Sequence, residues 1–285
     1  MNISIGILTH RSPITLFNTF LSYEASGLLK CTDDIFCIIQ PSDKQDQEVE
    51  CCNQFGVRPV VEKENGMMAW GIKRVFEEAK YDYVLFLEGD FRCLRPFEKT
   101  NALLKYSLDV LSKQEADVIR LRSLQKAGHP LQIQHFQGKE LSSEDYKRQL
   151  YVCTHYLDHP DEVFPEYISL VQKDPRVYKM TSKHCVYTNN PTLISKDFYR
   201  QNILPYIQFG RHLEPEIDFD WANKFNHKIY ITEGLFTHVR MDGHEGKNCW
   251  CCPTKYGGAS DTSSCSCCKG MRYDPQSFDE KDVEA

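Results

Sequence analysis

The sequence has no long apolar run and no secretory leader pattern. Its longest apolar stretches, such as residues 83–87, fall far short of the roughly 20 residues that a membrane-spanning helix needs. The first strand-like residues lead directly into polar Thr9, His10 and Arg11, without the basic start, apolar run and cleavage site of a signal peptide. These absences predict a soluble, cytoplasmic protein with no transmembrane segment.

The sequence also has no dense run of basic residues. Among 285 residues, 34 Lys and Arg are set against 40 Asp and Glu, which gives a formal net charge of -6. Nucleic-acid-binding proteins usually carry a basic face, so we expect no nucleic-acid partner. The length and the 41% hydrophobic content suit one large α/β domain with a short appendage, or two small domains.

Cysteine, in contrast, is abundant at one end of the chain. Thirteen cysteines are present, and six lie in two Cys-x-Cys-Cys clusters with twelve residues between them. Such clusters could bind structural Zn²⁺, form disulfides or remain free thiols, and Zn²⁺ is the interpretation we prefer. We therefore divide the chain into a main domain, 1–242, and a Cys-rich tail, 243–285. The six cysteines are Cys249, Cys251, Cys252, Cys265, Cys267 and Cys268.

Strand-like and helix-like periods alternate over the first 122 residues. We expect strands at 2–8, 34–40, 57–61, 83–87 and 117–121, and helices from Pro13 and at 45–55, 67–79 and 101–111. This alternation predicts a mostly parallel central sheet flanked by helices, with ligands at the carboxyl ends of the strands. Further on, we expect loops and short helices at 123–182, strands at 185–188, 192–195 and 228–231, and helices at 197–203 and 216–225.

Two acids directly follow the apolar strand at 83–87. Glu88 and Asp90, separated by Gly89, cannot both enter the core, because a bare buried carboxylate is too costly. At the edge of the sheet they could share a divalent cation with phosphate oxygens, and that cation would stabilise a leaving diphosphate as a Lewis acid. The alternative is that an acid–Gly–acid triplet simply forms a turn after a strand.

The acidic triplet resembles the Asp-x-Asp region of GT-A glycosyltransferases, with Glu in the first position. The segment Ile7-Leu-Thr9-His-Arg11-Ser-Pro13 resembles their first strand and nucleoside-binding turn, and Asn65-Gly66 before a helix resembles family 2-like members. The resemblance covers about residues 1–240. It implies a GT-A (Rossmann-like) fold and transfer of a sugar from a nucleotide-sugar, in particular a UDP-sugar, to a glycan or glycoprotein acceptor. By analogy, such compact transferases suit a bacterium or a large DNA virus.

Two downstream segments extend the resemblance. Thr188-Asn189-Asn190-Pro191 is similar to the segment beside the donor sugar, although it could equally be a turn. The acids of residues 214–220 resemble the region that supplies the catalytic base of inverting members, which takes the acceptor proton during attack. The resemblance implies Glu216 as the base and Asp218 as the next acid, with Glu214 in reserve.

The resemblance also implies the ligands of the donor. His238 follows the acidic helix and a strand, and would complete a metal site with Glu88 and Asp90, where imidazole favours Mn²⁺ over Mg²⁺. The expected donor-binding residues are Thr9, Arg11, Gln40, Asn65, Glu88, Gly89, Asn189 and Asn190.

Two other functions remain open. A nucleotidyltransferase shares the sheet and the metal-bound acids, but it usually has a Gly-rich basic loop after the first strand, where this sequence has no glycine. A non-catalytic sugar- or partner-binding module with a zinc tail is the second alternative.

Overall fold

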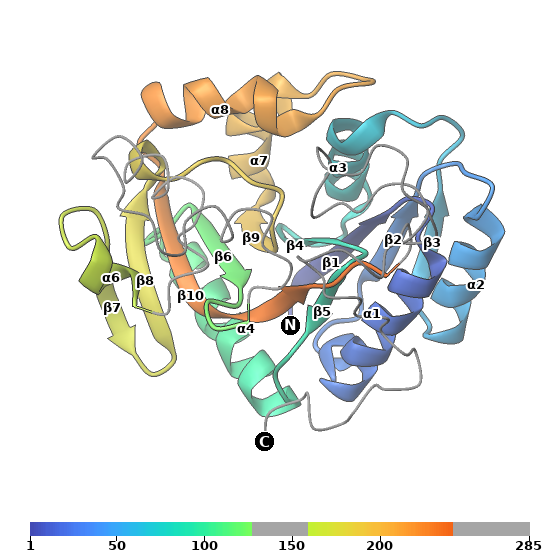
Figure 1. Ribbon diagram of the computed structural model, residues 1–285, viewed down its shortest axis with the longest axis horizontal. Coiled ribbons are helices and arrows are strands. Elements are labelled where there is room, and N and C mark those ends of the chain that lie inside the picture. The colour runs from blue at the N-terminus through green and yellow to red at the C-terminus, as the bar shows by residue number, and fades with distance from the viewer. Residues whose placement is uncertain (127–158, 242–285) are drawn as a thin grey trace, which may run out of the picture.

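The computed structural model describes residues 1–126 and 159–241 of the chain. The Cys-rich tail with its predicted Zn²⁺ ligands, and therefore the predicted domain boundary, lies outside the described residues, as do residues 127–158. In the described part, the strands form one ten-stranded sheet with helices on both sides (Figure 1). No helix in that part is long and apolar enough to cross a membrane.

The sheet has the order β3-β2-β1-β4-β9-β6-β10-β8-β7, and β5 pairs with β10 outside this path. Following the pairings from β1, only β5, β8 and β9 of the described strands run opposite to the others, so the predicted mostly parallel sheet is confirmed. The strands are β1 (Ile3–Thr9), β2 (Ile35–Ile39), β3 (Arg58–Val61), β4 (Tyr83–Glu88), β5 (Phe91–Cys93), β6 (Val118–Arg122), β7 (Ser169–Lys173), β8 (Arg176–Thr181), β9 (Thr192–Ser195) and β10 (Lys228–His238).

Alternating side chains of the strands supply two hydrophobic cores, one on each face. Ile5 and Leu85 belong to the core that α1, α2 and α4 cover, whereas Phe36 and Val84 belong to the core that α3, α7 and α8 cover. The helices are α1 (Pro13–Ala25), α2 (Gln45–Gln54), α3 (Met67–Glu78), α4 (Phe97–Ser112), α6 (Pro160–Val163), α7 (Lys196–Asn202) and α8 (Leu213–Asn223).

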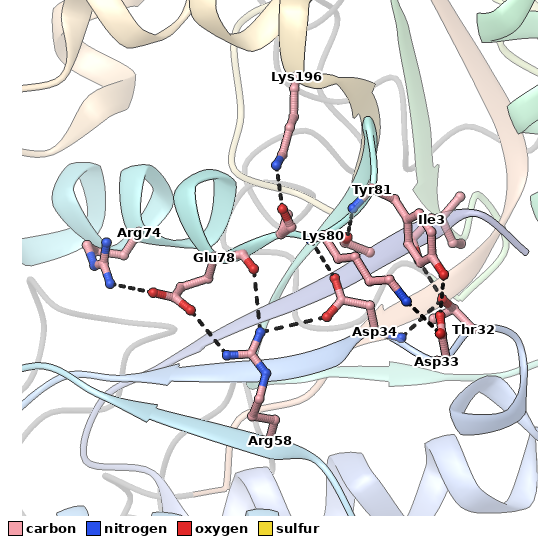
Figure 2. Close-up of polar contacts among 12 residues, drawn as sticks. Ile3, Thr32, Asp33, Asp34, Arg58, Arg74, Glu78, Lys80, Tyr81 and Lys196 are labelled. Carbon is pink, nitrogen blue, oxygen red and sulfur yellow. Dashed lines mark hydrogen bonds and ion pairs between the residues drawn. The ribbon is translucent and has the colours of Figure 1, made fainter.

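Hydrogen bonds and ion pairs fasten the amino ends of β2, β3 and β4 together (Figure 2). The buried Asp34 carboxylate accepts the backbone N–H of Lys80 at 2.8 Å and lies 3.7 Å from Arg58. Asp33 accepts hydrogen bonds from the Lys80 ammonium at 2.7 Å and from the Tyr81 hydroxyl at 2.6 Å. Side chains of this end of the sheet thus bind to one another and to the neighbouring backbone.

Four predictions of local structure were wrong. Residues 185–188 are not a strand, and the segment expected to hold loops and short helices contains the antiparallel pair β7–β8. Helix α8 begins at Leu213, three residues before the predicted start, because Pro215 falls in the first turn, where no backbone N–H needs a partner. Strand β10 continues past the predicted end at 231 to His238, because Gly234 (φ +85) accommodates an irregularity in its pairing with β6.

Candidate functional site

A cavity of 280 Å³ opens where β1, β2 and β4 end. Its volume is close to the lower end of the range for small-molecule sites, and its position is the one expected for a ligand of a parallel sheet. Six of the predicted site residues line it. The lining residues are Leu8, Thr9, His10, Ser12, Gln40, Asn65, Met67, Met68, Glu88, Gly89, Asp90, His212 and Arg240.

The turn between β1 and α1 forms one wall of the cavity. Its backbone passes through a left-handed conformation at Arg11 (φ 57), which non-glycine residues seldom adopt. Glu48 of α2 lies beneath this turn and is fully buried. It accepts hydrogen bonds from the Thr9 hydroxyl at 2.7 Å and from the Ser12 backbone N–H at 3.0 Å. The Thr9 hydroxyl proton is therefore directed to Glu48.

The acidic triplet follows β4 at the floor of the cavity. Gly89 packs against β1, and a Cβ at this position would lie 3.1 Å from the Thr9 hydroxyl oxygen and 3.2 Å from the Thr9 Cβ. The Gly89 carbonyl accepts a hydrogen bond from the Thr19 hydroxyl of α1 at 2.8 Å. A residue with no side chain at the middle of the triplet thus lets Glu88 and Asp90 sit close to the β1–α1 turn.

Asp90 contacts His238, the residue predicted to share a metal ion with it. The pairing of β5 with β10 sets Phe91 opposite His238, and the Val239 N–H donates to the Asp90 carbonyl at 2.8 Å. Asp90 Oδ2 then lies 3.1 Å from His238 Nε2. Burial disfavours the charged form of Asp90, but the adjacent His238 and the nearby Arg240 outweigh it and hold the pKa of this carboxyl below its usual value.

Glu88 lies at the centre of the charged groups of the site. Burial raises the pKa of its carboxyl well above the usual value, and the negative charges of Asp90 and Glu214 raise it further. Arg240 and Arg122 act in the opposite direction. Burial and the neighbouring acids thus favour the neutral form of Glu88, and the two arginines favour the carboxylate.

The opposite wall of the cavity is a chain of polar contacts from Asn65 to Gln40. The Asn65 side-chain oxygen accepts the Met67 N–H at 2.9 Å, and Met67 is itself left-handed (φ 61). The Met67 carbonyl accepts a hydrogen bond from Gln40 Nε2 at 3.1 Å. Because a carbonyl can only accept, this contact fixes the orientation of the Gln40 amide, and its buried Oε1 has no partner among the described residues.

Residues 187–190 are fastened to the start of α8 and to β6. The Asn189 N–H donates to Glu214 Oε1 at 3.0 Å, and the Tyr187 N–H donates to Asp218 Oδ1 at 3.2 Å. Arg122 donates to Asn190 Oδ1 at 2.7 Å. Burial raises the pKa of Asp218, although the Tyr187 N–H opposes this shift. Glu214 and Asp218, four residues apart on one face of α8, thus both turn toward this loop.

Six predicted residues of the described part do not line the cavity: Asn189, Asn190 and His238, whose contacts are given above, and Arg11, Glu216 and Asp218. Arg11 is exposed and pairs with Asp43 at 2.8 Å. Glu216 does not line the cavity, and helical spacing places it on the face of α8 that carries Asp220. Asp218 contacts the loop instead of the cavity. Of the three acids considered for the base, Glu214 is the one whose charge acts on Glu88.

Of the predicted metal ligands Glu88, Asp90 and His238, only Asp90 and His238 contact each other. In residues 1–126 and 159–241, no group of three or more His, Cys, Asp and Glu side chains is arranged to hold a metal ion. Asp90 and His238 nevertheless meet, and the second oxygen of Asp90, Oδ1, is buried without a hydrogen-bond partner in the described chain. A cation bound there would satisfy this oxygen, so the donor set is compatible with a hard or borderline divalent metal.

Sequence reasoning missed three charged residues of this region: Glu48, Arg122 and Arg240. Glu48 lies in an ordinary amphipathic helix, where an acid carries no distinguishing pattern. Arg122 ends β6 and Arg240 follows β10, so the rule that ligands gather after parallel strands could have identified both.

Comparison with known proteins gives similarity of fold only. No protein-family model matches the sequence, and no curated protein matches it. A fragment of TarS from S. aureus, residues 1–349, has a TM-score of 0.47 at 12% identity over 84% of this chain and 60% of that chain. The same fragment in complex with UDP-GlcNAc has a TM-score of 0.45 at 13% identity, over 85% of this chain and 60% of that chain. A nucleotidyl transferase from Methanothermobacter has a TM-score of 0.39 at 11% identity, over 84% of this chain and 88% of that chain. This chain thus spans 60% of the TarS fragment.

Proposed function

We propose that this protein is a glycosyltransferase that moves a sugar from a UDP-sugar to a hydroxyl of a glycan or glycoprotein acceptor, with inversion at the anomeric carbon. The observation that carries the proposal is the cavity at the carboxyl ends of β1, β2 and β4. It collects the acidic pair, the amide side chains of Gln40 and Asn65, and Arg240 in one place. These are the groups that a sugar diphosphate with a planar base requires.

The donor would lie across the floor of the cavity. The side-chain oxygen of Gln40 has no hydrogen-bond partner among the described residues, and it matches a ring N–H donor such as N3–H of uracil. Arg240 lies in the cavity and, with Arg122, acts electrostatically on Glu88, so both cations are placed to attract the diphosphate. This arrangement supports a uridine diphosphate donor.

Asp90 and His238 would hold a divalent cation, Mn²⁺ or Mg²⁺, with Glu88 beside them. That ion would neutralise the diphosphate and act as a Lewis acid toward the leaving group. That cation would also lower the pKa of Glu88, because the added positive charge favours the carboxylate.

Glu214 is the acid we propose as the general base. Its bond from the Asn189 N–H fixes the carboxylate, and because this bond uses Oε1, Oε2 remains to take the acceptor proton. Its charge acts on Glu88, which supports a position of Glu214 near the proposed donor site. Glu216, which the sequence favoured, stays the competing assignment, and the two acids can be separated by substitution.

The β1–α1 turn argues against a nucleotidyltransferase. In those enzymes the backbone N–H groups after the first strand bind phosphate. Here the Ser12 N–H and the Thr9 hydroxyl are already bound to the carboxylate of Glu48, which would repel a phosphate from the same donors. The proposed diphosphate site therefore lies at the acidic pair and not at this turn.

The test is a donor-hydrolysis screen of the purified full chain. UDP- and GDP-sugars would be incubated with Mn²⁺ or with EDTA, and the released nucleoside diphosphate measured. We expect release from one UDP-sugar that EDTA abolishes and Mn²⁺ restores. Release of pyrophosphate from a nucleoside triphosphate and a sugar phosphate would instead establish a nucleotidyltransferase. Binding of UDP by calorimetry without release from any donor would favour the non-catalytic module.

A further inference from the structure

The turn between β1 and α1 closes around a carboxylate from another helix. Glu48 is 0% exposed, and its Oε1 receives the Thr9 hydroxyl at 2.7 Å and the Ser12 N–H at 3.0 Å. The Arg11 backbone N–H also acts on this carboxylate. Donors from consecutive parts of one short turn thus converge on a side chain 36 to 39 positions further along the chain.

This convergence has the character of an anion-binding nest. Successive donors of a turn that includes a left-handed residue, here Arg11 at φ 57, form a concave surface that favours negative charge. In this protein the anion is an internal carboxylate, so the shape of the turn depends on a residue of α2. Glu50 of the same helix is exposed and hydrogen-bonds only to Gln54 among the contacts of the described chain, so it offers a matched control.

The outer side of the same turn faces the proposed donor site. Thr9, His10 and Ser12 line the cavity. The Ser12 hydroxyl oxygen accepts a hydrogen bond from Arg240 at 3.3 Å. A movement of the turn away from Glu48 would therefore shift one wall of the cavity and release a contact that holds the Arg240 guanidinium.

Burial of the Glu48 carboxylate costs the fold desolvation free energy. Burial raises the pKa of its carboxyl, and the bonds from Ser12 and Thr9 only partly oppose this. Its second oxygen, Oε2, is buried without a hydrogen-bond partner in the described part of the chain. A neutral residue of the same shape would remove the desolvation cost, so stability alone does not account for a carboxylate here.

We propose that Glu48 is a positioning residue, which holds the β1–α1 turn and, through Ser12, Arg240 in the geometry that binds the donor nucleotide. This inference rests on the proposed function for the identity of the ligand. It assigns Glu48 no contact with the donor and no part in proton transfer. Its loss should therefore weaken donor binding and leave the rate of the bound complex nearly unchanged.

The test compares Glu48→Gln and Glu48→Leu with Glu50→Gln in the full chain. Calorimetry with UDP and Mn²⁺ gives Kd, and donor release gives KM and kcat. For Glu48→Leu we expect Kd and KM to rise about tenfold, as for the loss of a charge-assisted hydrogen bond, with kcat within about twofold. Glu48→Gln keeps an acceptor oxygen, so we expect Kd and KM to rise only about threefold. We expect no fall in its melting temperature. Glu50→Gln should match the wild type.

Hydrogen–deuterium exchange of the peptide that covers residues 9–13 tests the turn without any ligand. We expect faster exchange in both Glu48 variants than in Glu50→Gln, with circular dichroism unchanged in Glu48→Gln. Unchanged exchange and Kd in Glu48→Gln and Glu48→Leu would overturn the inference, and so would a fall in kcat at constant KM. If the wild type neither binds UDP nor releases it, the proposed function fails, and the exchange data still decide whether Glu48 holds the turn.

Discussion

Asp90 and His238 lie 148 residues apart in sequence, yet Asp90 Oδ2 is 3.1 Å from His238 Nε2. The contact depends on the three-residue strand β5, whose antiparallel register with β10 sets Phe91 against His238. An acid in the first third of the chain and an imidazole in the last third are thus brought together beside the cavity. Four predictions follow from this arrangement and from its surroundings.

Substitution of Asp90 should abolish most of the transfer activity. Asp90→Asn keeps the size of the side chain and removes the charge that His238, Arg240 and the proposed cation share. We expect donor release to fall on the order of 100-fold, as when a preorganised electrostatic contact is removed. Steady-state kinetics with Mn²⁺ measures this. Asp109→Asn, which alters an exposed acid on α4, should behave as the wild type, and equal activity of the two variants would exclude Asp90 from the site.

Glu214→Gln and Glu216→Gln should differ sharply. Loss of a general base lowers kcat by roughly 100-fold to 10,000-fold, so we expect this for Glu214→Gln, with the Kd for UDP little changed. Glu216→Gln should stay within about threefold of the wild type, because helical spacing places it on the other face of α8 from Glu214, whose carboxylate binds the Asn189 N–H. The reverse result would restore Glu216 as the base.

Acid should destabilise the fold through His227. Burial lowers the pKa of this imidazole, which packs among Trp221, Phe225 and Phe198, although Asp117 opposes the shift. The unfolded chain, with a pKa near about 6.5, then binds more protons than the folded chain, so stability falls as pH drops through that value.

We expect the melting temperature to fall between pH 7.5 and pH 5.5, and less steeply in His227→Phe than in the wild type. His159→Gln replaces an exposed histidine and should leave the slope as it was. Parallel slopes for His227→Phe and the wild type would show that other groups cause the acid sensitivity. Thermal denaturation at closely spaced pH values provides the measurement.

Gly234→Ala should destabilise the protein far more than Gly56→Ala. Both glycines are left-handed, with φ values of +85 and +67, so each substitution carries about 1 kcal/mol or more of backbone strain. A Cβ at Gly234 would also lie 2.3 Å from the Arg122 carbonyl, whereas nothing lies within 4 Å of one at Gly56. We expect Gly234→Ala to lower the free energy of unfolding by about 3 kcal/mol or more, as measured by urea denaturation. Similar losses for the two variants would contradict the close packing of β6 and β10.

The sequence predicted well those elements that local pattern specifies. Strands β1 to β4 and helices α1 to α3 appeared within one or two residues of their expected bounds, because apolar periodicity and flanking turn residues mark them. The carboxyl edge of the sheet was also predicted to carry the site, and Thr9, Gln40 and Glu88 line the cavity there.

The parts that could not be predicted depend on contacts between distant segments. Strand β5 is three residues long and exists through its pairing with β10, and β7–β8 is a pair that no local period marks. The choice between Glu214 and Glu216 depends on which face of α8 packs toward Asn189, which spacing alone does not reveal. Glu48 was missed for the same reason, because its partners are in another element.

The pairing of β5 with β10 also determines when the candidate site can be complete during synthesis. Asp90 leaves the ribosome long before His238, and at that time the strands β1 to β4 have all emerged. The nascent chain can thus assemble the first half of its sheet while the acidic pair still lacks its imidazole partner. The contact between Asp90 and His238 forms only when β10, the last strand of the described chain, inserts between β6 and β8 and pairs with β5, well after β1 to β4 have emerged.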